Sequence, residues 1–196
     1  ALEGSIFVAG AAVQWLRDGL ALFDQASDSE ALAQQLDDNQ GVYFVPALTG
    51  LGAPYWRPDV RGAIVGLGRD TGQAHIARAA LEAQAYQTRD LIAAMTSDTG
   101  EVQSEIRADG GLIANQFMCQ FLADILQTPI DVPAVTEATA WGAASLAGLG
   151  AGVFADLDDI AEQWQKQQHF AVHMPSEEAD VLYTGWQLAV RSLLKY

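Results

Sequence analysis

The stretch IRADGGLIANQF, residues 106–117, joins two patterns of opposite kind through an acidic residue and a pair of glycines. The run over residues 104–108 is typical of a β-strand, whereas the run over residues 115–126 has the apolar spacing of an amphipathic helix. Because glycine favours turns, residues 109–111 are predicted to form the loop between them. The stretch therefore predicts a strand that ends directly in front of a helix.

Strands and helices are also predicted to alternate on both sides of this junction. Helices are expected over residues 6–20, 24–39 and 75–95, strands over residues 41–46 and 62–68, a sheet edge at residues 129–133, and further helices over residues 136–149 and 183–194. Asp156 is expected to cap a short helix between the last two. The alanine- and glycine-rich helix over residues 136–149 can lie very close to a neighbouring element. This order predicts an α/β layered domain with a mixed sheet.

The composition argues against two classes of partner. Ten basic side chains stand against 25 acidic ones, which gives the 196-residue chain a formal net charge of −15. Such a surface repels nucleic acid and anionic membranes, and no apolar run reaches the roughly 18 residues that span a bilayer. The length suits one domain or a compact pair. The single cysteine, Cys119, excludes an intrachain disulfide, fits a reducing compartment and is predicted to be a small buried thiol.

The glycine pair at the junction is the first candidate for ligand binding. Glycine permits a positive φ, and Gly110 and Gly111 let a ligand approach without a Cβ in the way. The helix beyond them offers N–H groups and a positive dipole end to a phosphate or ribose-phosphate, and Asn115, expected in its first turn, can turn an amide to the same ligand. In open α/β sheets, ligands gather beyond the carboxyl ends of strands. A tight turn followed by a helix cap explains the same residues, so both interpretations stay open.

Gly10 and Gln14 form the second candidate, because they stand at positions i and i+4 of one helix face and place bare backbone beside an amide. Helix packing next to a surface glutamine is the alternative. His75 is expected to be a capping or surface group. His169 and His173 have no third ligand near them in the sequence, and no acid/base pair or Ser/His/Asp set stands out.

Two longer stretches resemble a known family. GAIVGL at residues 62–67 and HIARAALE at residues 75–82 resemble the long C-terminal signature of the FGGY carbohydrate kinases. Further stretches resemble the glycerol kinase branch of that family, and the resemblance runs from Ala1 to about Trp186. These stretches are ALEG at residues 1–4 leading to QWLRD at residues 14–18, TGLGAPYW at residues 49–56, and AYQTRD at residues 85–90.

The resemblance implies a fold and a set of ligand contacts. The fold is an α/β, actin-like (ribonuclease-H-like) ATPase lobe with a mixed sheet flanked by helices, and residues 1–196 correspond to the C-terminal lobe, which holds most of the nucleotide. The family's nucleotide contacts fall on Gly10, Gln14, Gly111 and Asn115. Because the sequence opens on ALEGSIFVAG without a methionine, we expect a fragment of a two-lobe enzyme without its N-terminal lobe.

The implied reaction is transfer of the ATP γ-phosphoryl group, with Mg²⁺, to a primary hydroxyl of glycerol in the cytoplasm. In the family, the catalytic base and the glycerol contacts lie upstream of the part that this sequence resembles. No catalytic or metal-binding residue is therefore predicted in this chain, and the fragment alone is expected to be inactive. Asp109 is interpreted as a structural loop-former. A homo-oligomer, dimer or tetramer, is implied. Relatives usually carry an acid where Arg57 stands, and Asp59 can compensate. Alternatives are another FGGY kinase with a pentulose substrate, or an actin-like assembly module.

Overall fold

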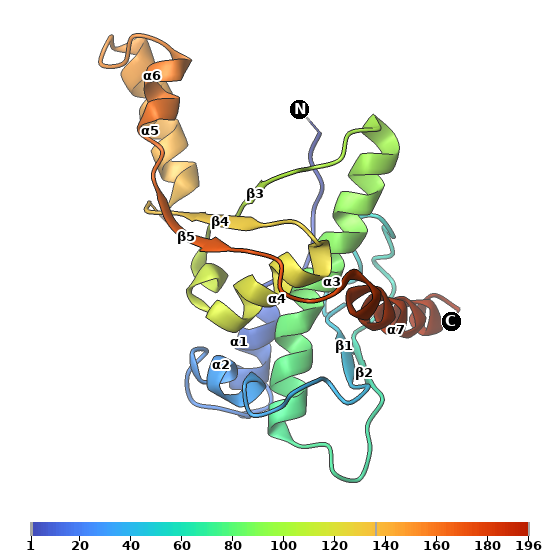
Figure 1. The fold of residues 1–196 in the computed structure, drawn as a ribbon. Coiled ribbons are helices and arrows are strands. Elements are labelled where there is room, and N and C mark those ends of the chain that lie inside the picture. Colours follow the sequence, from blue (N-terminus) through green and yellow to red (C-terminus); the bar gives the residue numbers. More distant parts are fainter. Residues whose placement is uncertain (1, 136, 196) are drawn as a thin grey trace.

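A computed structural model describes residues 2–135 and 137–195 and has the predicted mixed α/β architecture (Figure 1). Its helices are α1 Ala11–Asp18, α2 Asp28–Ala33, α3 Gln73–Thr99, the 3₁₀ turn η1 Gly111–Ala114, α4 Gln116–Leu126, α5 Ala138–Gly150, α6 Leu157–Glu162 and α7 Ser176–Leu194. Its strands are β1 Tyr43–Val45, β2 Ala63–Val65, β3 Ile106–Arg107, β4 Ile130–Pro133 and β5 Lys166–Phe170. None of the described helices is both long and apolar enough to cross a bilayer.

The 27-residue helix α3 is the centre of the body, and α1, α2, α4, α7 and β1 all pack against it (Figure 1). It covers the predicted range 75–95 and extends it at both ends. His75 caps the start, where its Nδ1 accepts the Gly72 N–H at 3.1 Å, which confirms the capping interpretation. Gly100, with a left-handed φ of 74°, ends the helix.

A buried carboxylate on α3 holds the C-terminal helix in place. Asp90 accepts hydrogen bonds from the Tyr183 hydroxyl and from Trp186 Nε1 of α7, the latter at 2.8 Å. The Tyr55 hydroxyl donates to the same carboxylate from the loop after β1, at 2.9 Å. Since the Trp186 side chain is fully buried, Asp90 is the only acceptor that its indole N–H meets among the described residues.

The strands form two small sheets. β1 and β2, which correspond to the strands predicted over residues 41–46 and 62–68, pair antiparallel. β3 pairs parallel with β4, and β4 pairs antiparallel with β5, so the predicted mixed sheet is confirmed. The prediction that residues 129–133 form a sheet edge was wrong, because β4 lies between the other two strands. Pro133 is tolerated there because it stands at the strand's last position, where the register shifts after Val132.

Three predicted helices have other limits in the structure. The helix expected over residues 6–20 begins only at Ala11, and the one expected over residues 24–39 is reduced to the six residues of α2. Farther along the expected range, the Asn39 side chain accepts the Gly41 N–H at 2.9 Å and forms a turn at its end. The last helix, α7, begins at Ser176, seven residues before the predicted start at position 183.

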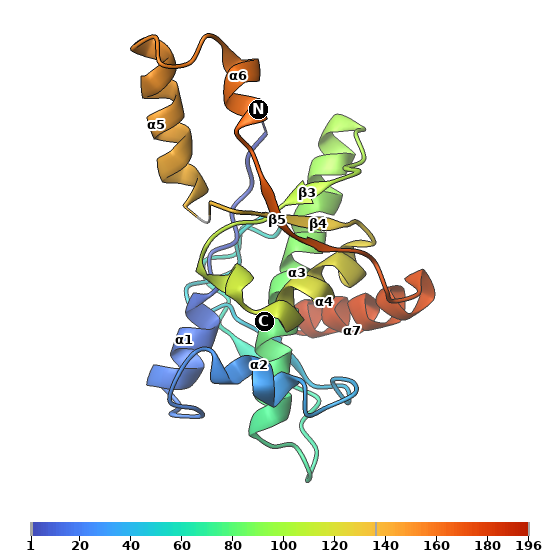
Figure 2. The ribbon, with the colours of Figure 1, turned by 60° about the vertical axis from the view of Figure 1, so that its left-hand side comes forward.

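The alanine-rich helix, whose small residues allow close packing, does not pack into the body of this chain. α5 and α6 project together from the body, away from α3 and α7 (Figures 1 and 2). Ser145 is the one described residue of α5 that is buried. The predicted cap at Asp156 is confirmed, since its side chain accepts the Asp159 N–H at 2.9 Å. Thr136, the expected first residue of the helix, lies outside the described residues.

Candidate functional site

The junction after β3 is built differently from the predicted strand–loop–helix. Gly110 adopts φ 94° and ψ 174°, a conformation that is essentially restricted to glycine. The 3₁₀ turn η1, which begins at Gly111, then lies between Gly110 and α4, so the α-helix does not begin where the loop ends. The N-terminus of α4 therefore lies one short turn away from the glycines.

Asn115 is the N-cap of α4 and not a residue of its first turn, which corrects the prediction. Its Oδ1 accepts the Met118 N–H at 2.9 Å, and its Nδ2 donates to Ser29 Oγ at 3.5 Å. The side chain is buried, and its carbonyl oxygen satisfies one of the free N–H groups at the helix start. Asn115 thus fixes the junction and leaves one amide hydrogen for a ligand.

Gly10 and Gln14 lie at the start of α1. Gly10 is the N-cap of the helix, and its carbonyl oxygen accepts the Gln14 N–H at 3.2 Å. The Gln14 side chain is exposed, and it makes no hydrogen bond to the described residues. The predicted pairing of a bare backbone position with a neighbouring amide side chain is therefore present. Because α1 begins at Ala11 and not at position 6, both residues stand about one turn nearer the start of the helix than expected.

A cavity of about 580 Å³ brings the four predicted residues together. Its lining comes from three segments, namely Ala9, Gly10, Ala11, Val13 and Gln14; Ala26, Ser27, Ser29 and Glu30; and Asp109, Gly110, Gly111, Leu112, Ala114 and Asn115. A Cβ added to Gly10 or to Gly111 would meet no atom within 4 Å. Both glycines therefore leave open space where a ligand can approach the backbone.

The wall formed by α2 and the turn before it was missed by the sequence analysis. Ser29 lies 86 positions before Asn115, and its Oγ donates to the Ala26 carbonyl at 2.6 Å while it accepts from Asn115. This chain of hydrogen bonds fixes α2 against the N-terminus of α4. The local sequence carried no signal for it, because the contact depends on how α2 packs on α3 and α4.

The charge of the cavity limits what it can hold. Its described lining contains two carboxylates, Glu30 and Asp109, and no lysine or arginine. Carboxylates attract hydrogen-bond donors and repel phosphate. The cavity therefore suits a part of a ligand that offers hydroxyl or amine donors, such as a sugar or a heterocyclic base.

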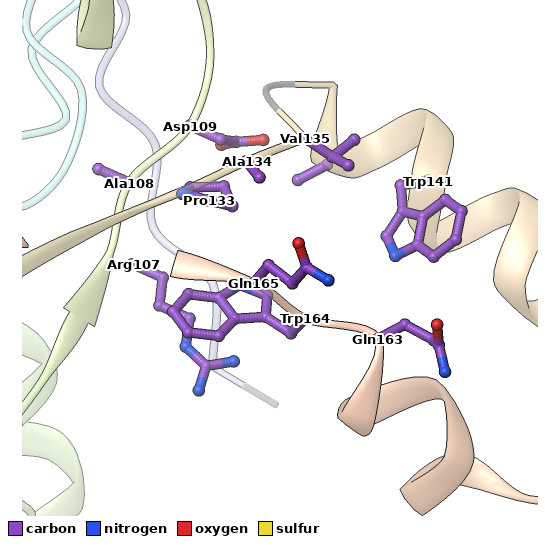
Figure 3. A pocket seen from close by; sticks show the side chains of 11 residues that line it. Arg107, Ala108, Asp109, Pro133, Ala134, Val135, Trp141, Gln163, Trp164 and Gln165 are labelled. Atoms are coloured by element: carbon purple, nitrogen blue, oxygen red, sulfur yellow. The ribbon is translucent and has the colours of Figure 1, made fainter. Parts of the chain in front are cut away.

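Asp109, which was interpreted as a loop-former, borders two cavities. Its side chain is exposed and makes no hydrogen bond to the described residues, and it lines a second cavity of about 460 Å³ as well as the first. The second cavity lies between the end of β3 and the base of α5 (Figure 3). Arg107 stacks over the Trp164 ring there, with its guanidinium carbon 4.1 Å from the ring centroid.

The remaining candidates from the sequence have structural roles. Cys119 is buried, its Sγ donates to the Ile113 carbonyl at 3.4 Å, and burial raises the pKa of its thiol to about 11. No group of three or more His, Cys, Asp or Glu side chains in the described parts of the chain could hold a metal ion. Arg57 forms a two-pronged ion pair with Asp59, at 2.8 and 2.6 Å.

His169 forms part of a charged cluster in the sheet. Its Nδ1 lies 2.5 Å from Asp131 Oδ1, and Lys166 pairs with the other carboxylate oxygen. Burial alone would raise the pKa of Asp131, but the hydrogen bonds and charges of Lys166 and His169 hold that pKa below its usual range. The cluster joins β4 to β5 and does not line the first cavity.

Comparisons with known proteins agree with this architecture. The C-terminal domain of the FGGY family of carbohydrate kinases matches residues 1–151. Glycerol kinase from Nitrosomonas eutropha is 60% identical over 194 residues, which are 99% of this chain and 39% of that protein. Glycerol kinase from Xanthomonas campestris is 56% identical over 196 residues, again 39% of its length. The chain thus spans about two fifths of the relatives that it matches.

Solved structures give the same result. Plasmodium falciparum glycerol kinase with ADP superimposes with a TM-score of 0.88 at 36% identity, over 97% of this chain and 38% of that one. Xylulose kinase from Rhodospirillum rubrum superimposes with a TM-score of 0.80 at 26% identity, over 97% of this chain and 39% of that one. The fold is that of an actin-like ATPase lobe, and the chain belongs to the FGGY family of carbohydrate kinases, as part of their C-terminal domain.

Proposed function

We propose that this chain is the nucleotide-binding lobe of a glycerol kinase, an enzyme that transfers the γ-phosphoryl group of ATP to glycerol and gives glycerol 3-phosphate. One observation carries the proposal. Two segments about 100 positions apart, which contain Gly10 with Gln14 and Gly111 with Asn115, line one cavity. The identity of 60% to a glycerol kinase supports glycerol as the acceptor.

The nucleoside part of ATP occupies this cavity in our proposal. Gly10 and Gly111 give it clearance, because neither has an atom in the space that a side chain would take. Gln14 offers a free amide and Asn115 one amide hydrogen, while Glu30 and Asp109 accept hydrogen bonds from the ribose or the base. ATP supplies the phosphoryl group, and the residues of this chain bind and orient the nucleoside.

By resemblance to the family, we assign the parts that act on the phosphates and on glycerol to the rest of a two-lobe enzyme. These parts are the catalytic base, the glycerol contacts and the residues that orient Mg²⁺, and we expect this lobe alone to be inactive. By resemblance to the family, the whole enzyme is a cytoplasmic homo-oligomer, dimer or tetramer.

A phosphorylation assay of the full-length polypeptide tests this function. With ATP and Mg²⁺, glycerol should be phosphorylated in preference to xylulose. Phosphorylation of xylulose alone would support a pentulose kinase, a possibility that the solved xylulose kinases keep open at 26% identity. If neither acceptor is phosphorylated while ATP still binds, both kinase assignments are wrong and an actin-like assembly module becomes the better explanation.

A further inference from the structure

The long helix α3 carries a buried ion pair that the proposed function does not use. Arg78 Nε donates to Glu82 Oε1 at 2.7 Å, one helical turn farther along. Both side chains are buried, although charged side chains seldom are. They stand in HIARAALE, residues 75–82, which resembles part of the family signature. A buried ion pair contributes little to stability by itself, so the other contacts of the pair indicate its role.

Arg78 holds the segment that follows α2. Its Nη1 donates to the carbonyl oxygen of Leu36. Leu36 is tied back to α2, because its own N–H donates to the Ala33 carbonyl at 3.3 Å. Basic side chains commonly bind the free carbonyl groups at the end of a helix. The guanidinium of Arg78 therefore anchors the C-terminal end of α2 to α3.

Arg78 also reaches the first turn of α4. Its guanidinium carbon lies 5.1 Å from the centroid of the Phe117 ring, which is within the range of a cation–π contact. Phe117 follows the N-cap, Asn115, by two positions. α2 and α4 both pack against α3 and against each other (Figures 1 and 2). One buried side chain thus connects the end of α2 with the start of α4.

Glu82 fixes the guanidinium of Arg78. Its carboxylate also accepts hydrogen bonds from Asn39 Nδ2 and from the Tyr86 hydroxyl, both at 3.1 Å. Glu82 is 1% exposed, so these donors replace the water that the carboxylate loses on burial. Asn39 lies three positions after Leu36. Glu82 therefore anchors the segment after α2 at a second point.

The two elements that Arg78 connects both line the cavity proposed for the nucleoside. α2 contributes Ser29 and Glu30, and the N-cap of α4 contributes Asn115. Because Asn115 Nδ2 donates to Ser29 Oγ, the orientation of this amide depends on where α2 lies relative to α4. Neither Arg78 nor Glu82 lines the cavity. Any effect of the ion pair on a bound nucleotide must therefore pass through α2 and α4.

We propose that Arg78 is a positioning residue for the nucleotide site. It fixes α2 against α4, and it thereby keeps the hydrogen bond between Ser29 and Asn115 in place at the cavity wall. The inference deepens the proposed function and rests on it, because the cavity is assigned there to the nucleoside. A role in core stability alone is the alternative. Asp90 has such a role on the same helix, since its hydrogen-bond partners do not line the cavity.

ADP binding to the full-length polypeptide, measured by calorimetry well below each melting temperature, separates the two roles. Arg78→Lys keeps a charge opposite Glu82, but an ammonium group lacks the planar fork that also reaches Leu36 and lies over Phe117. We expect the dissociation constant of ADP to rise about tenfold, the order that one lost hydrogen bond costs, while the KM for glycerol at saturating ATP stays unchanged. Asp90→Ala is the matched control, with lower stability and unchanged ADP affinity.

Two further variants make the test independent of folding and of the route. The double variant Arg78→Met/Glu82→Gln leaves no buried charge unpaired, so it should show the same loss of affinity even if Arg78→Lys does not fold. Ser29→Ala tests the route through α2. Because both changes act on the same amide, Arg78→Lys/Ser29→Ala should bind ADP no more weakly than the weaker single variant. Losses that multiply would refute this route.

The outcomes that would overturn the positioning role are distinct from those that concern the function. Equal ADP affinity in the wild type and in the Arg78 variants would overturn it. A similar loss in Asp90→Ala would assign the effect to stability and would also overturn it. Absence of ADP binding in the wild type would refute the proposed function itself, on which the inference rests.

Discussion

Replacement of Gly111 by valine separates ligand binding from folding at the candidate site. A Cβ at this position meets no protein atom within 4 Å, and its φ is outside the left-handed range. We therefore expect the substitution to change the free energy of unfolding by less than about 0.5 kcal/mol. The isopropyl group would take the open space at Gly111, which lines the cavity of about 580 Å³. Its effect should consequently appear in nucleotide affinity.

The size of the affinity loss follows from packing. A side chain inserted into a filled, close-packed space raises the free energy of that state by about 1–3 kcal/mol. Each 1.4 kcal/mol corresponds to a tenfold change in dissociation constant, so Gly111→Val should weaken ATP or ADP binding by about five- to 150-fold. Since the valine does not touch the acceptor site in the proposed arrangement, the KM for glycerol at saturating ATP should not change.

Isothermal titration calorimetry of the full-length polypeptide measures this affinity, and a thermal melt without nucleotide measures the stability. Gly72→Val is the matched control, because Gly72 also has open space around its missing Cβ, has a φ of −128° and lies outside the cavity. Unchanged ADP affinity in Gly111→Val, with the control also unchanged, would refute the placement of the nucleoside. A large loss of thermal stability would refute the packing estimate.

The other predictions concern stability. Gly110→Ala should lower the free energy of unfolding by about 1–3 kcal/mol in a urea titration, because φ 94° strains an alanine, and no loss would show that the loop relaxes. Asp90→Ala should cost about 3 kcal/mol in the same assay, since the buried Trp186 N–H loses its acceptor, and a loss below about 1 kcal/mol would contradict this. The Asp131 carboxyl group has a lower pKa in the folded protein than in the unfolded chain, where it is about 4. The stabilisation that the ionised carboxylate provides is therefore fully present above about pH 4 and is lost as the pH falls through the lower pKa of the folded protein. Asp131→Asn should therefore be less stable than the wild type at pH 7, with the difference shrinking in acid melts below pH 4, and a difference independent of pH would contradict the assignment.

The features that the sequence predicted correctly have local causes. Gly110 and Gly111 indicated a junction because few other residues tolerate the backbone found there. The long helix α3 was predictable from an apolar stripe without glycine or proline inside it. The meeting of Gly10 and Gly111 in one cavity was different. Local patterns offered each glycine as a separate candidate, and only the resemblance to the family placed the two in one site.

The features that were predicted wrongly depend on tertiary contacts. Asn115 was expected in the first turn of the helix, but it stands one position earlier, where its carbonyl oxygen caps α4 and its amide contacts Ser29. The α2 wall of the cavity could not be anticipated, since a six-residue helix has too little periodicity to show which face packs. β4 was predicted to be an edge because of its prolines, although Pro133 needs only the end of a strand and not the edge of a sheet.

α5 shows how far a local prediction reaches. Alanine favours the helix with or without a neighbour, so the composition predicts the helix but does not show what packs against it. Asp109 lines both the cavity proposed for the nucleoside and the cavity beside α5. Because Asp109, Gly110 and Gly111 form one loop, that loop borders both cavities, and no single stretch of the sequence indicated this arrangement.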